Sequence, residues 1–202
     1  MHYSYHQTLV AIWEKAVTQY GAGKREADTF FIEAEETFLA SIGANAQEVY
    51  DFAEDFSRHG EPDFATFILL QDLRRAYFLE VQGGVPSGKV TESDTMPPKE
   101  ASRDGIVWLP RIIPKALAKL RGEMNPDLMY GCGGDRKFFR NNDIHPAELL
   151  RIVWENEDDE EAIVKWVVAR AERPNQPSSG NAVTSSISGY GTTHTAIPHP
   201  TR

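Results

Sequence analysis

The sequence predicts an all-α protein in which two small helical modules pack together and a disordered tail follows. Apolar residues recur at three- and four-residue spacing through most of the chain, whereas period-two alternation is rare. Glycines and prolines punctuate these periodic segments where helices end and begin. We expect an N-terminal module over 1–82, a linker over 83–103, a C-terminal module over 104–172 and a tail over 173–202.

The N-terminal module is expected to contain four helices. They cover about residues 7–20, 28–42, 46–58 and 62–81. Gly21, Gly43 and Gly60 follow the first three, and Pro62 suits the first position of the fourth. The fourth helix opens with FATFILL, which is apolar nearly all round and predicts a central, buried helix.

Two arginines, Arg74 and Arg75, lie in this buried helix. A buried guanidinium requires compensation of its charge. We therefore expect one of them to pair with an acid on the preceding helix, where Asp51, Glu54 and Asp55 are the candidates.

The segment 83–103 is rich in Gly, Pro, Ser and Thr, and it predicts a long loop. Four helices are expected after it. The first starts near Pro110 and Pro114 and carries one apolar stripe, formed by Leu109, Ile112, Ile113, Ala116, Leu117 and Leu120. Asp135 is expected to cap a helix that runs to about residue 142. Pro146 opens the next helix, and the last covers 160–171 with Asp158 or Asp159 as its cap.

An internal repeat is a further hypothesis. The segments 38–55 and 138–155 align at a spacing of 100 residues, so that Glu48 meets Glu148. Two amphipathic helices after a short turn would give a similar match by chance. If the repeat is real, it predicts two similar helical halves.

Composition limits the classes of function. The chain has 202 residues, a net charge of −9 and 25% charged residues, which disfavours nucleic acid and anionic membranes as partners. The longest strongly apolar run is too short to cross a bilayer, and the first residues lack the features of a secretory signal. The single cysteine cannot form an internal disulfide. We expect a cytoplasmic protein.

Two motifs stand out in the C-terminal module, GIVWLPR (105–111) and YGCGGD (130–135). With these motifs, the segment over about 104–170 resembles a bacterial domain family of unknown function, numbered 5069. The resemblance implies a small helical module and brings no chemistry with it.

The same glycine-rich motif is the main candidate for a binding site. Residues 109–140 carry seven bases and three acids within an acidic chain, and glycines free backbone N–H groups to hold an anion. Two arginines at this site would clamp a carboxylate or phosphate. The expected ligand-binding set is Arg111, Tyr130, Gly131, Cys132, Gly133, Gly134, Asp135 and Arg136. A tight turn with a solvated basic face would show the same pattern.

The predicted function is therefore a non-catalytic module that binds a protein or a small anion at residues 130–136. The alternative is a thiol-dependent enzyme in which Cys132 is the nucleophile and His145 the base. The histidines are scattered, and no metal-binding or cofactor-binding motif occurs. We expect neither a metal nor a cofactor, and the sequence leaves open whether any reaction is catalysed.

Overall fold

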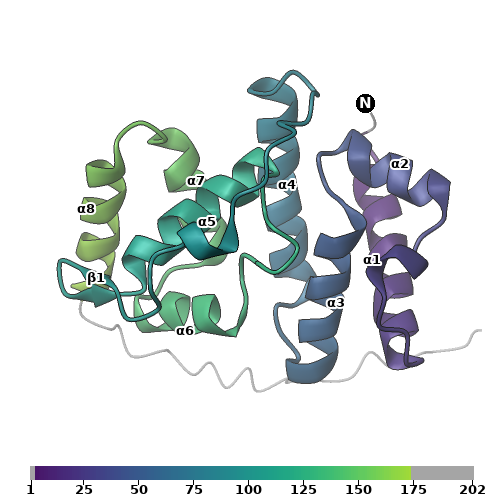
Figure 1. The fold of residues 1–202 in the computed structure, drawn as a ribbon, viewed down its shortest axis with the longest axis horizontal. Helices are drawn as coiled ribbons and strands as arrows, with labels where there is room; N and C mark the ends of the chain where they lie inside the picture. The colour runs from purple at the N-terminus through teal and green to yellow at the C-terminus, as the bar shows by residue number, and fades with distance from the viewer. Residues whose placement is uncertain (1–2, 174–202) are drawn as a thin grey trace, which may run out of the picture.

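The computed structural model describes residues 3–173, and this part of the chain is almost entirely helical (Figure 1). Its elements are α1 (Tyr5–Gly21), η1 (Ala27–Thr29, one 3₁₀ turn), α2 (Glu33–Ser41), α3 (Ala46–His59), α4 (Phe64–Glu80), η2 (Ser93–Thr95), β1 (Ser102–Arg103), β2 (Ile106–Val107), α5 (Leu109–Arg121), α6 (Gly133–Asn141), α7 (Pro146–Glu155) and α8 (Glu160–Ala171). The predicted all-α class is confirmed. The predicted tail lies, apart from Arg173, outside the described residues.

Helix α4 occupies the centre of the molecule. Figure 1 shows α1, α2 and α3 on one side of it and α5 to α8 on the other. It packs against α1, α5 and α7, and its Phe67 and Leu70 are fully buried. One continuous hydrophobic core therefore runs from Leu9 in α1 to Val167 in α8. The expectation of a central, buried fourth helix is confirmed, whereas the boundaries of two modules stay a prediction.

The helix bounds support the internal repeat. Helix α2 begins and ends 100 residues before α6, and α3 begins 100 residues before α7. Helices α2 and α6 end with equivalent backbone hydrogen bonds. Ala44 N donates to Leu39 O over 2.9 Å after α2, and Ile144 N donates to Phe139 O over 3.0 Å after α6. Bounds and turns thus coincide at a single offset, as a duplicated segment requires.

A pair of charged side chains repeats at the same offset. Lys15 Nζ lies 2.5 Å from Glu35 Oε2, and Lys115 Nζ lies 2.5 Å from Asp135 Oδ2. Each pair joins the first helix of its half to the second. The first pair is partly exposed, whereas the side chains of Lys115 and Asp135 are 3% and 0% exposed. The two halves therefore share an ion pair that only the second half buries.

The structure differs from the sequence prediction at several helix starts. Asp63 caps α4 by accepting a hydrogen bond from Thr66 N, so Pro62 precedes the helix and does not open it. Cys132, not Asp135, is the N-cap of α6, and the predicted cap is wrong there. The predicted helix over 28–42 is divided into η1 and α2. The helix start expected at Pro146 and the cap expected at Asp159 are confirmed.

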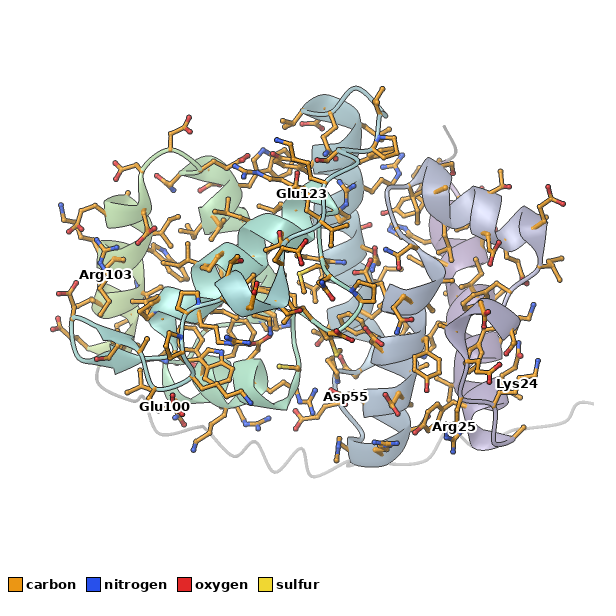
Figure 2. The ribbon with its side chains drawn as sticks, viewed as in Figure 1. Lys24, Arg25, Asp55, Glu100, Arg103 and Glu123 are labelled. Atoms are coloured by element: carbon orange, nitrogen blue, oxygen red, sulfur yellow. The ribbon has the colours of Figure 1, made fainter. Side chains whose placement is uncertain are left out.

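The predicted loop before α5 ends in a hairpin that the sequence analysis missed. Strands β1 and β2 pair antiparallel and are joined by Asp104 and Gly105. Both residues have positive φ, and Asp-Gly is a preferred sequence for a two-residue hairpin turn of this kind. Arg103 pairs with Glu160 and Glu161 at the start of α8, and Figure 2 shows its side chain beside that helix. The hairpin is thereby tied to the last helix.

None of the helices within residues 3–173 combines the length and the apolarity that spanning a bilayer demands.

The two equivalent ion pairs provide a matched test of burial. We expect Asp135→Ala to lower the free energy of unfolding by about 3–5 kcal/mol, because it leaves a buried ammonium without its partner. Glu35→Ala removes the equivalent, more exposed acid and should cost only about 1 kcal/mol. Urea denaturation followed by circular dichroism measures both. Equal losses in the two variants would contradict this account.

Candidate functional site

Asp135 is the centre of the glycine-rich loop that the sequence singles out. Its carboxylate accepts hydrogen bonds from Trp108 Nε1 at 2.8 Å and from Gly131 N at 2.9 Å, in addition to the ion pair with Lys115. The carboxylate is completely buried. A protein acid therefore already occupies the place where an anion was expected to bind.

The two arginines of the predicted clamp also have partners inside the protein. Arg136 Nη1 lies 2.5 Å from Asp55 Oδ2 on α3 and donates to Gly131 O over 2.9 Å. Figure 2 shows Asp55 on the side of α3 that faces this loop. Arg111 Nη1 donates to Pro97 O over 2.7 Å. The two guanidinium groups thus bond to different elements.

The remaining loop residues fit close packing. Tyr130 is buried, and its hydroxyl donates to Pro146 O over 2.8 Å. A Cβ atom on Gly134 would lie 2.5 Å from the Trp108 ring, so only glycine fits there. Gly133 and Cys132 form the start of α6. The loop's own contacts account for these residues, and its binding role stays a prediction.

The thiol and the imidazole of the alternative hypothesis have different surroundings. Cys132 Sγ is half-buried and lies 3.4 Å from Lys115 Nζ. His145 caps α7, because its Nδ1 accepts from Ala147 N at 3.2 Å. Its imidazole lines an open cavity of about 590 Å³ beside α6, to which Cys132 does not contribute.

That open cavity is rich in arginines, but each has an acid partner among the described residues. Arg140 Nη1 lies 2.8 Å from Glu61 Oε2, and Arg170 Nη2 lies 3.1 Å from Glu148 Oε1. Arg136 is paired with Asp55. The cavity therefore holds no uncompensated guanidinium.

A second, more enclosed cavity of about 300 Å³ has a different electrostatic character. It lies between the first turns of α3, the side of α4 and the segment that follows α5. Figure 2 labels Glu123 at this end of α5. Arg74, Lys119, Asp51 and Glu48 line the cavity together with the apolar side chains of Met124 and Met129. Cavities of this size with a few convergent polar groups are typical of small-molecule sites.

Arg74 is the cation in this cavity that has no acid partner. It is 3% exposed, and its Nη1 donates to Leu120 O at 2.9 Å and to Gln82 Oε1 at 2.8 Å. Its Nε is buried without a hydrogen-bond partner, and no carboxylate of residues 3–173 forms an ion pair with it. Burial lowers the pKa of Arg74 to about 10, so the group stays charged at neutral pH. The acid partner expected on α3 is therefore wrong for Arg74.

Two glycines make room for this guanidinium. A Cβ atom on Gly122 would overlap Arg74 Nη2, and a Cβ atom on Gly43 would lie 3.0 Å from its Cζ. Both glycines have positive φ and follow helices, so they also end α5 and α2. Two glycines from different parts of the chain therefore pack against the guanidinium of Arg74.

Arg170 shows the compensation that Arg74 lacks, although at the 100-residue offset it corresponds to Leu70 and not to Arg74. In the second half, Arg170 donates from Nε to Asp143 O and pairs with Glu148. The residues at the equivalent positions of the first half are Gly43 and Glu48, 100 residues earlier. Glu48, however, is in contact with the buried ammonium of Lys119 and is not bonded to Arg74. Arg74 is therefore buried near an acid, Glu48, that contacts Lys119 instead.

Asp51 is the second group of the cavity without an ion partner. Its Oδ1 accepts from Gln47 Nε2 at 2.7 Å, and no cation of residues 3–173 pairs with it. Burial raises the pKa of Asp51 to about 7; the hydrogen bond from Gln47 opposes this, and the nearby Glu54 and Asp55 add to it. Burial also lowers the pKa of Lys119. Shifted pKa values in one cavity are typical of functional sites.

The sequence singles out these residues only in part. Arg74 is predicted to be a buried charge, and Asp51 is one of three candidate partners for Arg74 or Arg75. None of the residues around this cavity is assigned to a binding site from the sequence. The sequence indicates a buried arginine, Arg74, and a glycine, Gly122, at the end of another predicted helix. Only the tertiary packing brings these two residues together.

The described residues form an almost entirely helical protein around one shared core. Residues 97–187 match the model of a family described as a domain of unknown function (DUF5069). The match contains α5 to α8 and confirms the resemblance inferred from the motifs over 104–170. No curated protein matches the chain. No solved structure matches it either.

The raised pKa of Asp51 predicts a pH-dependent stability. The unfolded chain loses this proton near the ordinary pKa of 3.8 and the folded protein near 7, so wild-type stability falls as pH rises from about 4 to 7. We expect Asp51→Asn to raise the free energy of unfolding by about 1–4 kcal/mol at pH 8 and to have little effect at pH 4. Urea denaturation at both pH values measures this. The exposed control Asp158→Asn should match wild type, and a gain for Asp51→Asn that is independent of pH would contradict the assignment.

Proposed function

We propose that the protein is a non-catalytic binding module that holds a small anionic ligand in the cavity between α3, α4 and α5. Arg74 is the group that anchors the ligand. The proposal keeps the class of function expected from the sequence, a small-anion binder, and moves the site away from residues 130–136. The reason for the move is that Asp135 and Arg136 are bonded to other groups of the protein.

The observation that carries the proposal is the buried, charged guanidinium of Arg74 without a carboxylate partner. Removing a charge from water costs several kcal/mol, and a protein recovers this cost only by pairing the charge. The guanidinium Nε has no hydrogen-bond partner, and a carboxylate oxygen would supply the acceptor that it lacks. A bound anion would provide the compensation that Glu148 provides for Arg170.

The alternative of a thiol-dependent enzyme has weaker support. Cys132 lies beside Lys115, but the His145 imidazole is engaged as the cap of α7. A single, half-buried cysteine also suits a reducing compartment, and we include a cytoplasmic location in the proposal on that ground.

Ligand-induced stabilisation tests the proposal. Hexanoate at 100 times its dissociation constant should raise the free energy of unfolding of the full chain by about 2.7 kcal/mol, seen as a higher melting temperature. Arg74→Gln should remove this effect, because it removes the anchoring charge, whereas Arg74→Lys should retain part of it.

The matched control is Arg151→Gln, which removes an exposed arginine paired with Glu155 far from the cavity. It should respond to hexanoate as wild type does. If Arg74→Gln is folded by circular dichroism and is still stabilised to the same extent, Arg74 does not anchor the ligand.

A further inference from the structure

Two side chains of opposite charge, the buried Arg74 and the half-buried Asp51, line the same cavity and do not pair with each other. We infer that the ligand anchored by Arg74 is an amino acid with an apolar body, whose carboxylate binds Arg74 and whose ammonium binds Asp51. This inference rests on the proposed function and goes beyond it, because it assigns a second anchoring group and a ligand class.

Asp51 has the properties of an ammonium acceptor. One of its carboxylate oxygens, Oδ1, accepts from Gln47 Nε2, and the residue is half-buried and lines the cavity. The Lys119 ammonium in the same cavity is in contact with Glu48 and not with Asp51. A cationic group of a ligand is therefore the missing partner of Asp51.

The rest of the cavity suits an apolar body of modest size. Met124, Leu128 and Met129 line it from the segment after α5, and methionine side chains adapt to different apolar shapes. The volume of about 300 Å³ equals that of roughly ten liquid water molecules. An amino acid of the size of leucine or methionine fits this space.

Other ligand classes leave one charge uncompensated. A simple carboxylate neutralises Arg74 but leaves Asp51 without a cation, and an alkylamine does the reverse. A phosphate dianion would meet one guanidinium edge while Glu48 and Asp51 repel its second charge. Only a ligand that carries both charges satisfies both side chains.

The test compares ligands that differ in one charged group. Isothermal titration of the full chain at pH 7.5 would use L-leucine, L-methionine, 6-aminohexanoate, hexanoate, hexylamine and phosphate. We expect the best amino acid to bind at least tenfold more tightly than hexanoate and hexylamine. The comparison of L-leucine with 6-aminohexanoate reports the spacing of the two charges.

Variants then assign the two anchors. Asp51→Asn should weaken amino acid binding at least tenfold and leave hexanoate binding equal or stronger, whereas Arg74→Gln should abolish both. Asp158→Asn, an exposed acid on the turn before α8, should bind as wild type does. Circular dichroism and melting curves of each variant establish that it is folded.

The pH dependence gives an independent measurement. The charged groups around Asp51 are Glu48, Glu54 and Asp55 on α3, Arg74 on α4 and Lys119 on α5. Because burial raises the pKa of Asp51 to about 7, an ammonium ligand should bind about tenfold more tightly at pH 8 than at pH 6. Hexanoate should show no such gain, and Asp51→Asn should lose it.

The outcomes separate the inference from the proposed function. Hexanoate or phosphate binding through Arg74 as tightly as the amino acids would overturn the amino acid inference and keep the anion site. A tenfold pH effect that survives in Asp51→Asn would also overturn it. Absence of Arg74-dependent binding by every ligand would overturn both.

Discussion

The packing of the C-terminal half depends on the contacts of one buried carboxylate, that of Asp135. It joins the ammonium of Lys115 on α5, the indole of Trp108 at the start of that helix and the backbone of Gly131. Such a group is stable in the interior only when all its hydrogen-bonding capacity is used. The loop must therefore approach α5 closely, and Gly134 permits this because any side chain there would strike Trp108.

This arrangement also connects the two halves of the chain. Arg136, the residue after Asp135, bonds both the loop carbonyl of Gly131 and the carboxylate of Asp55 on α3. These contacts account for the composition of the glycine-rich motif. Gly134 permits close packing against Trp108, Asp135 accepts hydrogen bonds from several donors, and Arg136 forms an ion pair with α3. The same residues that resemble an anion cradle in the sequence are used by the protein to hold its halves together.

The two segments that align at an offset of 100 residues differ in how far their charged pairs are buried. The Lys15–Glu35 pair stayed near solvent, whereas Lys115–Asp135 is enclosed. In α4 and α8 the arginines also differ, since Arg170 pairs with Glu148 whereas Arg74 is buried and forms no ion pair with a described carboxylate.

Much of the fold follows from local sequence, because helix bounds depend on nearby caps and on apolar spacing. The helices at 46–59 and 160–171 were predicted closely for this reason. The hairpin around Asp104 was missed because each strand has only two residues, too few for a period-two pattern. The surroundings of Arg74 could not be predicted, because Gly43, Asp51 and Gly122 meet there only after α3, α4 and α5 have packed.

The origin of the cavity walls has a consequence for stability. Gly43 and Asp51 come from the N-terminal part of the chain, whereas Lys119, Gly122 and Met129 come from the C-terminal part. Neither part encloses the space alone, so a molecule held there would touch both and would oppose their separation.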